Sequence, residues 1–241
     1  MFDYNESEKN IRDSQATDYE HWYTSQKGFA FDQLEKKVFE NNIKQGKYKN
    51  ALEIGCGTGR ITVSVSKLVD KITAVDISKN SLDILRSKNL INVKLLQADC
   101  RFDFPFAKDE KFDLVFSCQV FQHWQLNDII NFFTNIKKFL TPNGVIIFSV
   151  YNFDYFKFHS IPEILENGLY SKRFNKNYIR YLARKCKYDI TRISYYKSLP
   201  NSFYKKNEKY AHLIITIDQK ICMLKPLVRF FNFMLCNFKI A

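Results

Sequence analysis

The sequence predicts an α/β fold in which a mostly parallel sheet carries helices on both faces. Three observations indicate it: a glycine-rich loop follows an apolar strand, short β-rich runs alternate with amphipathic helical segments after that loop, and several of those runs end in a carboxylate. Strands that alternate with helices form parallel sheets through right-handed crossovers. Such sheets bind ligands at the carboxyl ends of their strands, so we look for a site there.

The glycine-rich loop is the most specific of these features. It reads Glu-Ile-Gly-Cys-Gly-Thr-Gly-Arg over residues 53–60 and directly follows Ala-Leu. Glycine at alternate positions lets the backbone turn sharply and approach a ligand that any Cβ would obstruct. Arg60 stands where the dinucleotide fingerprint would place its last glycine. Glu53, two residues before the first glycine, suits a positively charged ligand better than a pyrophosphate.

Periodicity and capping signals define the elements that follow. We expect a helix over 61–69, a strand over 71–76, a helix that begins at the N-cap Ser78, strands over 92–99, 112–117 and 144–150, and a helix over 126–140 that ends in the turn 141–144. Asp76 and Asp99 then end the second and third strands, as Glu53 ends the first. A carboxylate at the tip of the second strand accepts hydrogen bonds from ribose hydroxyls in nucleotide-binding folds.

The last third of the chain is less distinctive. We expect a loop and short helix inserted near 151–168, a basic helix over 177–187, two strands over 189–197 and 209–218, and an apolar, aromatic helix over 221–240. Basic residues and a proline interrupt this last segment, so it lacks the roughly 20 apolar residues of a spanning helix. It can pack on the domain, pair with another subunit or lie in a membrane interface. The expected units are 1–45, 46–218 with an insertion near 151–187, and 219–241.

Residues 19–150 resemble the class I S-adenosylmethionine-dependent methyltransferases, which have a Rossmann-like fold. The loop, the strand-end acids and the order of elements carry the resemblance, which is closest to the type 11, ubiquinone-biosynthesis-like branch. It implies a seven-stranded sheet completed by two antiparallel-type strands, an N-terminal helical cover and S-adenosyl-L-methionine as cofactor. The implied cofactor-binding residues are Tyr19, Trp22, Lys27, Glu53, Gly55, Cys56, Gly57, Thr58, Asp76, Ile77, Asp99, Cys100, Ser117 and Cys118.

The resemblance also implies roles for some of these residues. Asp99 would face the adenine amino group beside the backbone amide of Cys100, and the carbonyls of Ser117 and Cys118 would face the methionine amino group. In the N-terminal segment, the rings of Tyr19 and Trp22 would lie near the sulfonium, which an aromatic face attracts, and Lys27 near the methionine carboxylate. A surface helix with ordinary core aromatics is the alternative for that segment.

Transfer to a hydroxyl needs a general base, which His123, just past the fourth strand, is placed to supply. His21 and Tyr151 are further candidates, and a structural role for a lone histidine is the alternative. No Asn-Pro-Pro-Tyr or Asp-Pro-Pro-Tyr run follows Ser117 and no cysteine follows a proline. Both absences argue against methylation of adenine nitrogen or cytosine carbon in DNA.

Charge is distributed unevenly along the chain. The net charge is +12, with 17 basic and 6 acidic residues from Tyr151 onward against 20 and 19 before it. Such a field concentrates anionic partners, although a solvated lysine-rich face is the alternative. The six cysteines include no Cys-x-x-Cys pair, and no secretory signal opens the chain, so reduced thiols in the cytoplasm are expected, with contact at the inner membrane surface as a variant and no metal site.

Three functions remain open from the sequence. The first is a methyltransferase acting on a hydroxyl or carbon of a small, anionic molecule, such as a phosphorylated sugar or a lipid-linked precursor. The second is an RNA methyltransferase that docks its substrate on the basic C-terminal third. The third is a scaffold that keeps the cofactor fold without catalysis. The oligomeric state is not predicted.

Overall fold

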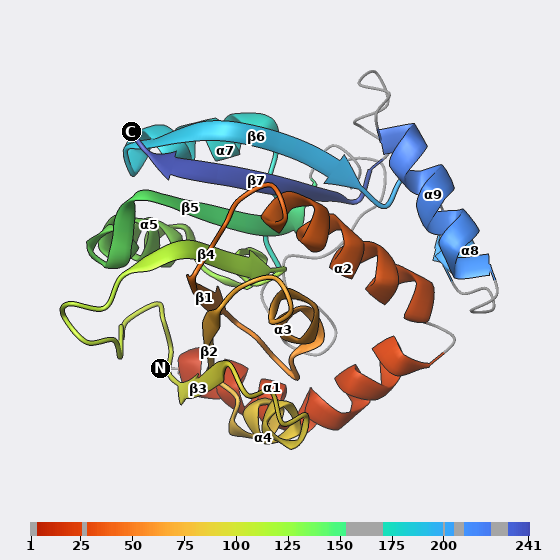
Figure 1. Ribbon diagram of the computed structural model, residues 1–241, viewed down its shortest axis with the longest axis horizontal. Helices are drawn as coiled ribbons and strands as arrows, with labels where there is room; N and C mark the ends of the chain where they lie inside the picture. Colours follow the sequence, from red (N-terminus) through yellow and green to blue (C-terminus); the bar gives the residue numbers. More distant parts are fainter. Residues whose placement is uncertain (1–3, 26–27, 153–170, 200, 205–209, 223–230) are drawn as a thin grey trace.

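The computed structural model describes residues 4–25, 28–152, 171–199, 201–204, 210–222 and 231–241. Seven strands form one sheet in the order β3-β2-β1-β4-β5-β7-β6 (Figure 1). Neighbouring strands among β1 to β5 are parallel, whereas β7 is antiparallel to both β5 and β6. The seven-stranded, mostly parallel sheet is therefore confirmed. The strands are β1 (Asn50–Ile54), β2 (Lys71–Asp76), β3 (Val93–Gln97), β4 (Phe112–Cys118), β5 (Leu140–Tyr151), β6 (Tyr188–Tyr196) and β7 (Phe233–Ile240).

Helices cover both faces of this sheet. Buried residues of α2, α3, α4 and α9 form one core with one face, and those of α5 and α7 form a second core with the other. Ser78 caps α4 as expected, because its side chain accepts from the Ser81 amide. The helices are α1 (Tyr4–Thr24), α2 (Phe29–Ile43), α3 (Arg60–Val65), α4 (Lys79–Ser87), α5 (Leu126–Asn135), α7 (Lys176–Lys185), α8 (Asn201–Tyr204) and α9 (Ala211–Cys222), with 3-10 turns η1 (Phe121–His123) and η2 (Ile136–Phe139).

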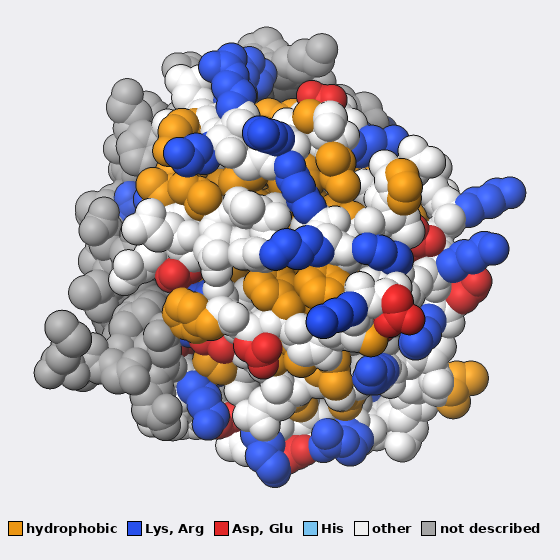
Figure 2. All heavy atoms as spheres, turned by 90° about the vertical axis from the view of Figure 1, so that its left-hand side faces the viewer, with side chains coloured by type: hydrophobic (Ala, Val, Ile, Leu, Met, Phe, Trp, Pro, Cys, Tyr) orange, Lys and Arg blue, Asp and Glu red, His pale blue; other side chains and the backbone are white. Residues whose placement is uncertain are grey.

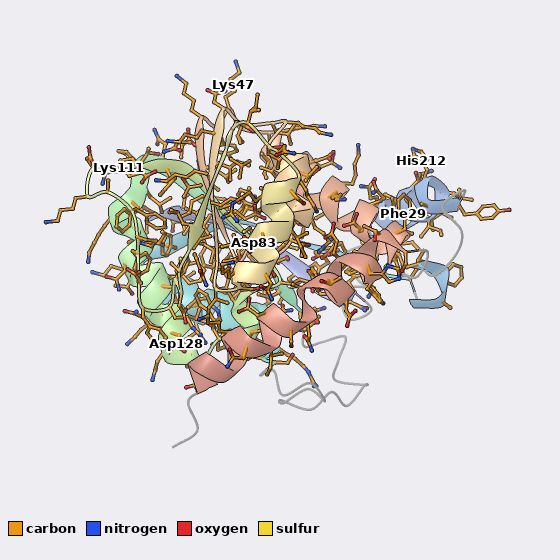
Figure 3. The ribbon with its side chains drawn as sticks, turned by 90° about the horizontal axis from the view of Figure 1, so that it is seen from below. Phe29, Lys47, Asp83, Lys111, Asp128 and His212 are labelled. Atoms are coloured by element: carbon orange, nitrogen blue, oxygen red, sulfur yellow. The ribbon has the colours of Figure 1, made fainter. Side chains whose placement is uncertain are left out.

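Helix α1 packs beside α4 and the start of α2 rather than on a face of the sheet. Seen from below, it crosses the molecule next to the helix that carries Asp83 (Figure 3). Asp13 of α1 accepts hydrogen bonds from Ser78 Oγ at 2.7 Å and from the Asn80 amide at 3.1 Å. Of the expected N-terminal cover, α1 therefore crosses the ends of the strands, while α2 belongs to the helical layer.

The seventh strand comes from a different segment than the sequence predicted. The expected strand over 209–218 is wrong, because 211–222 form α9, with Ile214 and Asp218 buried and Leu213 and Ile217 exposed. The expected terminal helix over 221–240 is also wrong over 233–240, which form β7. A strand between two neighbours is buried on both faces and reads as a continuous apolar run, which periodicity alone does not separate from a helix. Most apolar side chains of β7 are buried in the sheet core: Phe233, Met234, Leu235, Cys236 and Phe238.

Other differences are local. The expected turn 141–144 lies inside β5, where the pairing with β4 shifts register between Phe112 and Leu114. The helix expected over 61–69 ends at Val65, and the one over 126–140 continues as η2. The basic helix and the strand β6 are confirmed. Most of the insertion expected near 151–168 lies outside the described residues. Within the described ranges, the structure has no helix that is both long and apolar enough to cross a membrane.

Candidate functional site

A cavity of about 130 Å³ lies where α1 passes over the carboxyl ends of the strands. It is lined by α1, by the glycine loop, and by residues that follow β2, β3 and β4. Two of the three strand-end acids, Asp76 and Asp99, thus meet the glycine loop at one cavity, whereas Glu53 does not line it. Of the expected binding residues, the cavity is lined by Tyr19, Gly55, Gly57, Asp76, Ile77, Asp99, Cys100 and Cys118.

The glycine loop leaves room above its backbone. Gly57 has φ +53°, and a Cβ built there would meet no atom within 4 Å, so this glycine faces open space. Gly59 has φ +86°, and a Cβ there would collide with the Leu85 side chain of α4. Gly59 therefore serves the packing of the loop, whereas Gly57 lets a ligand approach the backbone closely.

Asp76 connects the glycine loop to the start of α4. Its carboxylate accepts from the Gly57 amide at 2.7 Å and from the Ser78 amide at 2.9 Å. Burial raises the pKa of Asp76, and these two backbone hydrogen bonds counteract the rise. Because each carboxylate oxygen can accept more than one hydrogen bond, Asp76 can hold the loop and still receive ribose hydroxyls.

Asp99 is held by a buried arginine that the sequence analysis did not identify. Arg101 donates from Nε and Nη2 to the Asp99 carboxylate, at 2.8 and 2.6 Å, and from Nη1 to Glu8 Oε2 at 2.8 Å. The Arg101 side chain is only 1% exposed, although it carries a charge. This pairing fixes Asp99 at the cavity wall and attaches α1 beside it. The expected contact of Asp99 with an adenine amino group stays a prediction.

Glu53 ends β1 but points into the core instead of into the cavity. It is 2% exposed, and its Oε2 accepts from Thr62 Oγ1 at 2.6 Å. Burial raises the pKa of Glu53 to about 8. Thr58 is also buried, and its hydroxyl hydrogen-bonds to Glu20 of α1. These two residues support the loop and its cover from outside the cavity.

The end of β4 brings further polar groups to the cavity. Ser117 is buried and donates to the Ile54 carbonyl at 2.9 Å, which ties β4 to β1. Gln119 lines the cavity with φ +57°, a conformation that non-glycine residues adopt mostly at strained or functional positions. Its side-chain amide donates to Glu35 of α2. Burial raises the pKa of the thiols of Cys56 and Cys118, so both stay protonated.

The remaining expected residues fall around the cavity. Trp22 is 40% exposed and packs on Tyr23, away from the lining, and Lys27 lies outside the described residues. His123 is buried in η1 beside Trp124, and it is Trp124 that lines the cavity. His21 is exposed on α1. Tyr151 is half-buried at the end of β5, where burial raises its pKa to about 12.

A second buried charge cluster joins the site to α2. Arg60, directly after the glycine loop, pairs with Asp32 at 2.7 Å and with Glu35 at 2.8 Å, and lies 3.7 Å from the centre of the Tyr23 ring. Glu35 is fully buried and accepts from Arg60, Gln119 and Tyr196. Arg60 therefore anchors the loop to the helical layer, which explains a charged residue where a dinucleotide fingerprint has glycine.

Comparison with known proteins agrees with this geometry. A family model described as "Methyltransferase domain" matches residues 51–144, which include the glycine loop and all three strand-end acids. Residues 51–144 thus form a methyltransferase domain, as the resemblance to the class I S-adenosylmethionine-dependent methyltransferases implied. The family resemblance inferred from the sequence is thereby confirmed.

Two curated relatives and one solved structure are similar to this chain. A malonyl-[acyl-carrier protein] O-methyltransferase of Bacillus cereus is 29% identical over 59% of this chain and 51% of its own length. A ubiquinone biosynthesis O-methyltransferase of Pasteurella multocida is 30% identical over 43% and 47%. The chain thus spans about half the length of these relatives. The structure titled "DhpI-SAH complex structure" shares the fold, with a TM-score of 0.67 over 98% of this chain and 97% of its own, at 17% identity.

Three residues important to the site were missed from the sequence. Arg101 lies two positions after Asp99, just past the third strand. This short spacing between opposite charges is a signal that the sequence does contain. Gln119 directly follows β4, but no local pattern marks its left-handed backbone. Glu35 lies on a helix distant in sequence, so only the packing of α2 against the sheet reveals it.

Proposed function

We propose that this chain transfers a methyl group from S-adenosyl-L-methionine to a hydroxyl or carbon of a small molecule. The convergence of Gly57, Asp76 and Asp99 on one cavity carries the proposal. Open space at Gly57 allows a ligand to approach the protein backbone closely. The two carboxylates are acceptors suited to ribose hydroxyls and an adenine amino group. Ile77 and Ala98 add apolar lining between them, as a nucleoside base requires.

The chemistry divides between cofactor and protein. The bound sulfonium supplies an electrophilic methyl group, so the protein has to bind, orient and exclude water. Asp76 and Asp99 would orient the nucleoside, while Tyr19 and Trp124 add aromatic surface to the cavity lining. For a hydroxyl acceptor, His123 remains the proposed base, because it adjoins Trp124 at the β4 end of the site.

One group of exposed basic side chains lies on the side of the sheet away from the cavity, where RNA could not reach the methyl donor. Figure 2 shows lysine and arginine side chains spread over the face that holds the amino ends of the parallel strands, opposite the cavity. An RNA bound to that face would lie away from the methyl donor. The exposed lysines at that edge, before the parallel strands or at the end of β7, are Lys47, Lys49, Lys71, Lys111, Lys138, Lys187 and Lys239.

Calorimetry with S-adenosylhomocysteine tests the proposal, with Gly57→Val as the matched control because its side chain would occupy the space open above the loop. We expect saturable binding by the natural chain and none by the control. Transfer of labelled methyl groups to a small-molecule panel and to bulk RNA then separates the two acceptor classes. Absence of binding at millimolar ligand would refute the proposal and favour the scaffold.

A further inference from the structure

The end of β6 holds a lysine in an unusual backbone conformation. Lys197 follows Tyr196 with φ +61°, although a side chain disfavours the left-handed region. Asp218 of α9 fixes this conformation, because its carboxylate accepts from the backbone amides of Lys197 and Ser198. Since β6 runs parallel to β5, Lys197 lies at the sheet edge that also carries the cavity. Strained residues of this kind concentrate at functional positions.

Aromatic rings surround the ammonium group of Lys197. Its Nζ lies 4.3 Å from the ring centre of Phe31, 5.4 Å from that of Phe233 and 5.9 Å from that of Tyr204. Ring faces attract a cation, but they replace only part of its hydration. Burial accordingly lowers the pKa of Lys197 to about 8, against the opposing influence of the Glu35 and Asp218 charges.

The carboxylates around Lys197 are engaged elsewhere. Asp32 pairs with Lys36 and Arg60, and Glu35 pairs with Arg60. Asp218 accepts, besides the two amides, from the hydroxyls of Ser198 and Tyr204. Among the described residues, no carboxylate forms an ion pair with the Lys197 ammonium. The Lys197 ammonium is thus a half-buried cation at the edge of the sheet that carries the cavity, and the nearest carboxylates, Glu35 and Asp218, act on it without a direct ion pair.

A continuous set of contacts links Lys197 to the cavity. Tyr196, the preceding residue, donates to Glu35 Oε1 at 2.9 Å, and Gln119 donates to the same oxygen. Gln119 in turn lines the cavity. Tyr151, Phe233 and Tyr196 stand in register across β5, β7 and β6, so their side chains share the face beside this path. Lys197 does not line the cavity, and Tyr196, Glu35 and Gln119 connect it to the side of the cavity that Gln119 lines.

We propose that Lys197 binds the anionic group, a carboxylate or a phosphate, of the methyl acceptor. Within the proposed function, on which this inference rests, the reacting atom of the acceptor lies at the Gln119 end of the cavity and its anionic group at Lys197. The site thus selects small acceptors that carry a negative charge at a distance from the nucleophile. Lys197 acts in recognition, and no proton transfer is assigned to it.

The test uses the full-length chain saturated with S-adenosylhomocysteine and monitors the lysine side chains by NMR after isotope labelling. The probes are benzoate and phenyl phosphate, with benzamide as the neutral match. Lys197→Met removes the cation, Lys197→Arg retains it, and Lys220→Met on the exposed part of α9 is the matched control.

We expect both anions, but not benzamide, to raise the pKa of Lys197, because a bound negative charge favours the protonated amine. Anion affinity should fall about 10- to 100-fold in Lys197→Met, the loss of one charge-assisted contact, and persist in the arginine and Lys220 variants. An unshifted Lys197 signal in a chain that still binds S-adenosylhomocysteine would refute this inference alone. Failure to bind S-adenosylhomocysteine would instead refute the proposed function.

Discussion

Replacing Glu53 by Gln should change how stability depends on pH. Glu53 is buried with a pKa of about 8, against an ordinary value of 4.5. Below pH 4.5 the group is protonated in both folded and unfolded chains and costs nothing. Between pH 4.5 and 8 the unfolded chain loses the proton while the folded chain keeps it, so the free energy of unfolding falls as pH rises. By pH 7 this cost reaches about 3 kcal/mol, at 1.36 kcal/mol per pH step.

Glutamine keeps the shape and can accept the Thr62 hydrogen bond through its carbonyl oxygen, but it does not titrate. Urea unfolding followed by tryptophan fluorescence measures this difference in the free energy of unfolding. The measurements are made at about pH 5, 6, 7 and 8, because this range spans most of the interval between the two pKa values. The free energy of unfolding of the variant, relative to that of the natural chain, should rise steadily across this pH range. Asp109→Asn, at an exposed loop position, is the control. Parallel curves for the natural chain and Glu53→Gln would refute the reasoning.

Two further predictions concern the other strand ends. Asp76→Ala removes the acceptor of the Gly57 and Ser78 amides together with the proposed ribose partner. Calorimetry should therefore show S-adenosylhomocysteine binding weakened by about 1–3 kcal/mol. Unchanged affinity would count against this placement of the ribose. Arg101→Met removes the buried cation that Glu8 and Asp99 share, which leaves Glu8 only its longer 3.6 Å pair with Arg12, and should destabilise the fold by about 3–5 kcal/mol in urea. Arg86→Met breaks an exposed pair and should leave the unfolding midpoint unchanged.

The sequence predicted those parts of the fold in which local signals and tertiary packing agree. The glycine loop, β2 and the capped helix α4 each carry a turn, a β-rich run or a cap within a few residues. The C-terminal part failed because its pattern was ambiguous. Leu213, Ile215 and Ile217 alternate as in a strand. The segment is nevertheless a helix, and its residues Ile214 and Asp218 face the protein core. The interior strand β7 is apolar on both faces, so it has no alternation to identify it.

The candidate site divides in the same way. Asp76 and Asp99 were found because strand ends meet at one edge of a parallel sheet, which is a property of topology. Glu53 shares that sequence pattern, but it pairs in register with Ala74, two residues before Asp76. It therefore lies deeper in the sheet, where it accepts from Thr62. Glu35, Gln119 and Lys197 come from three distant elements. Their association depends on how α2 and β6 pack, which no short motif records.

The contacts of α1 explain how a cavity roofed by a helix can admit a ligand. This helix contributes little to the cores, with Ala16 and Tyr23 its buried apolar residues among those described. Its attachments are polar: Glu8 to Arg101, Asp13 to Ser78 and Glu20 to Lys88. Water can replace such contacts, and separation of α1 exposes little apolar surface, so local opening costs much less than unfolding the sheet. Asp76 is held by the amides of Gly57 and Ser78, neither of which belongs to α1, so its place does not depend on this helix.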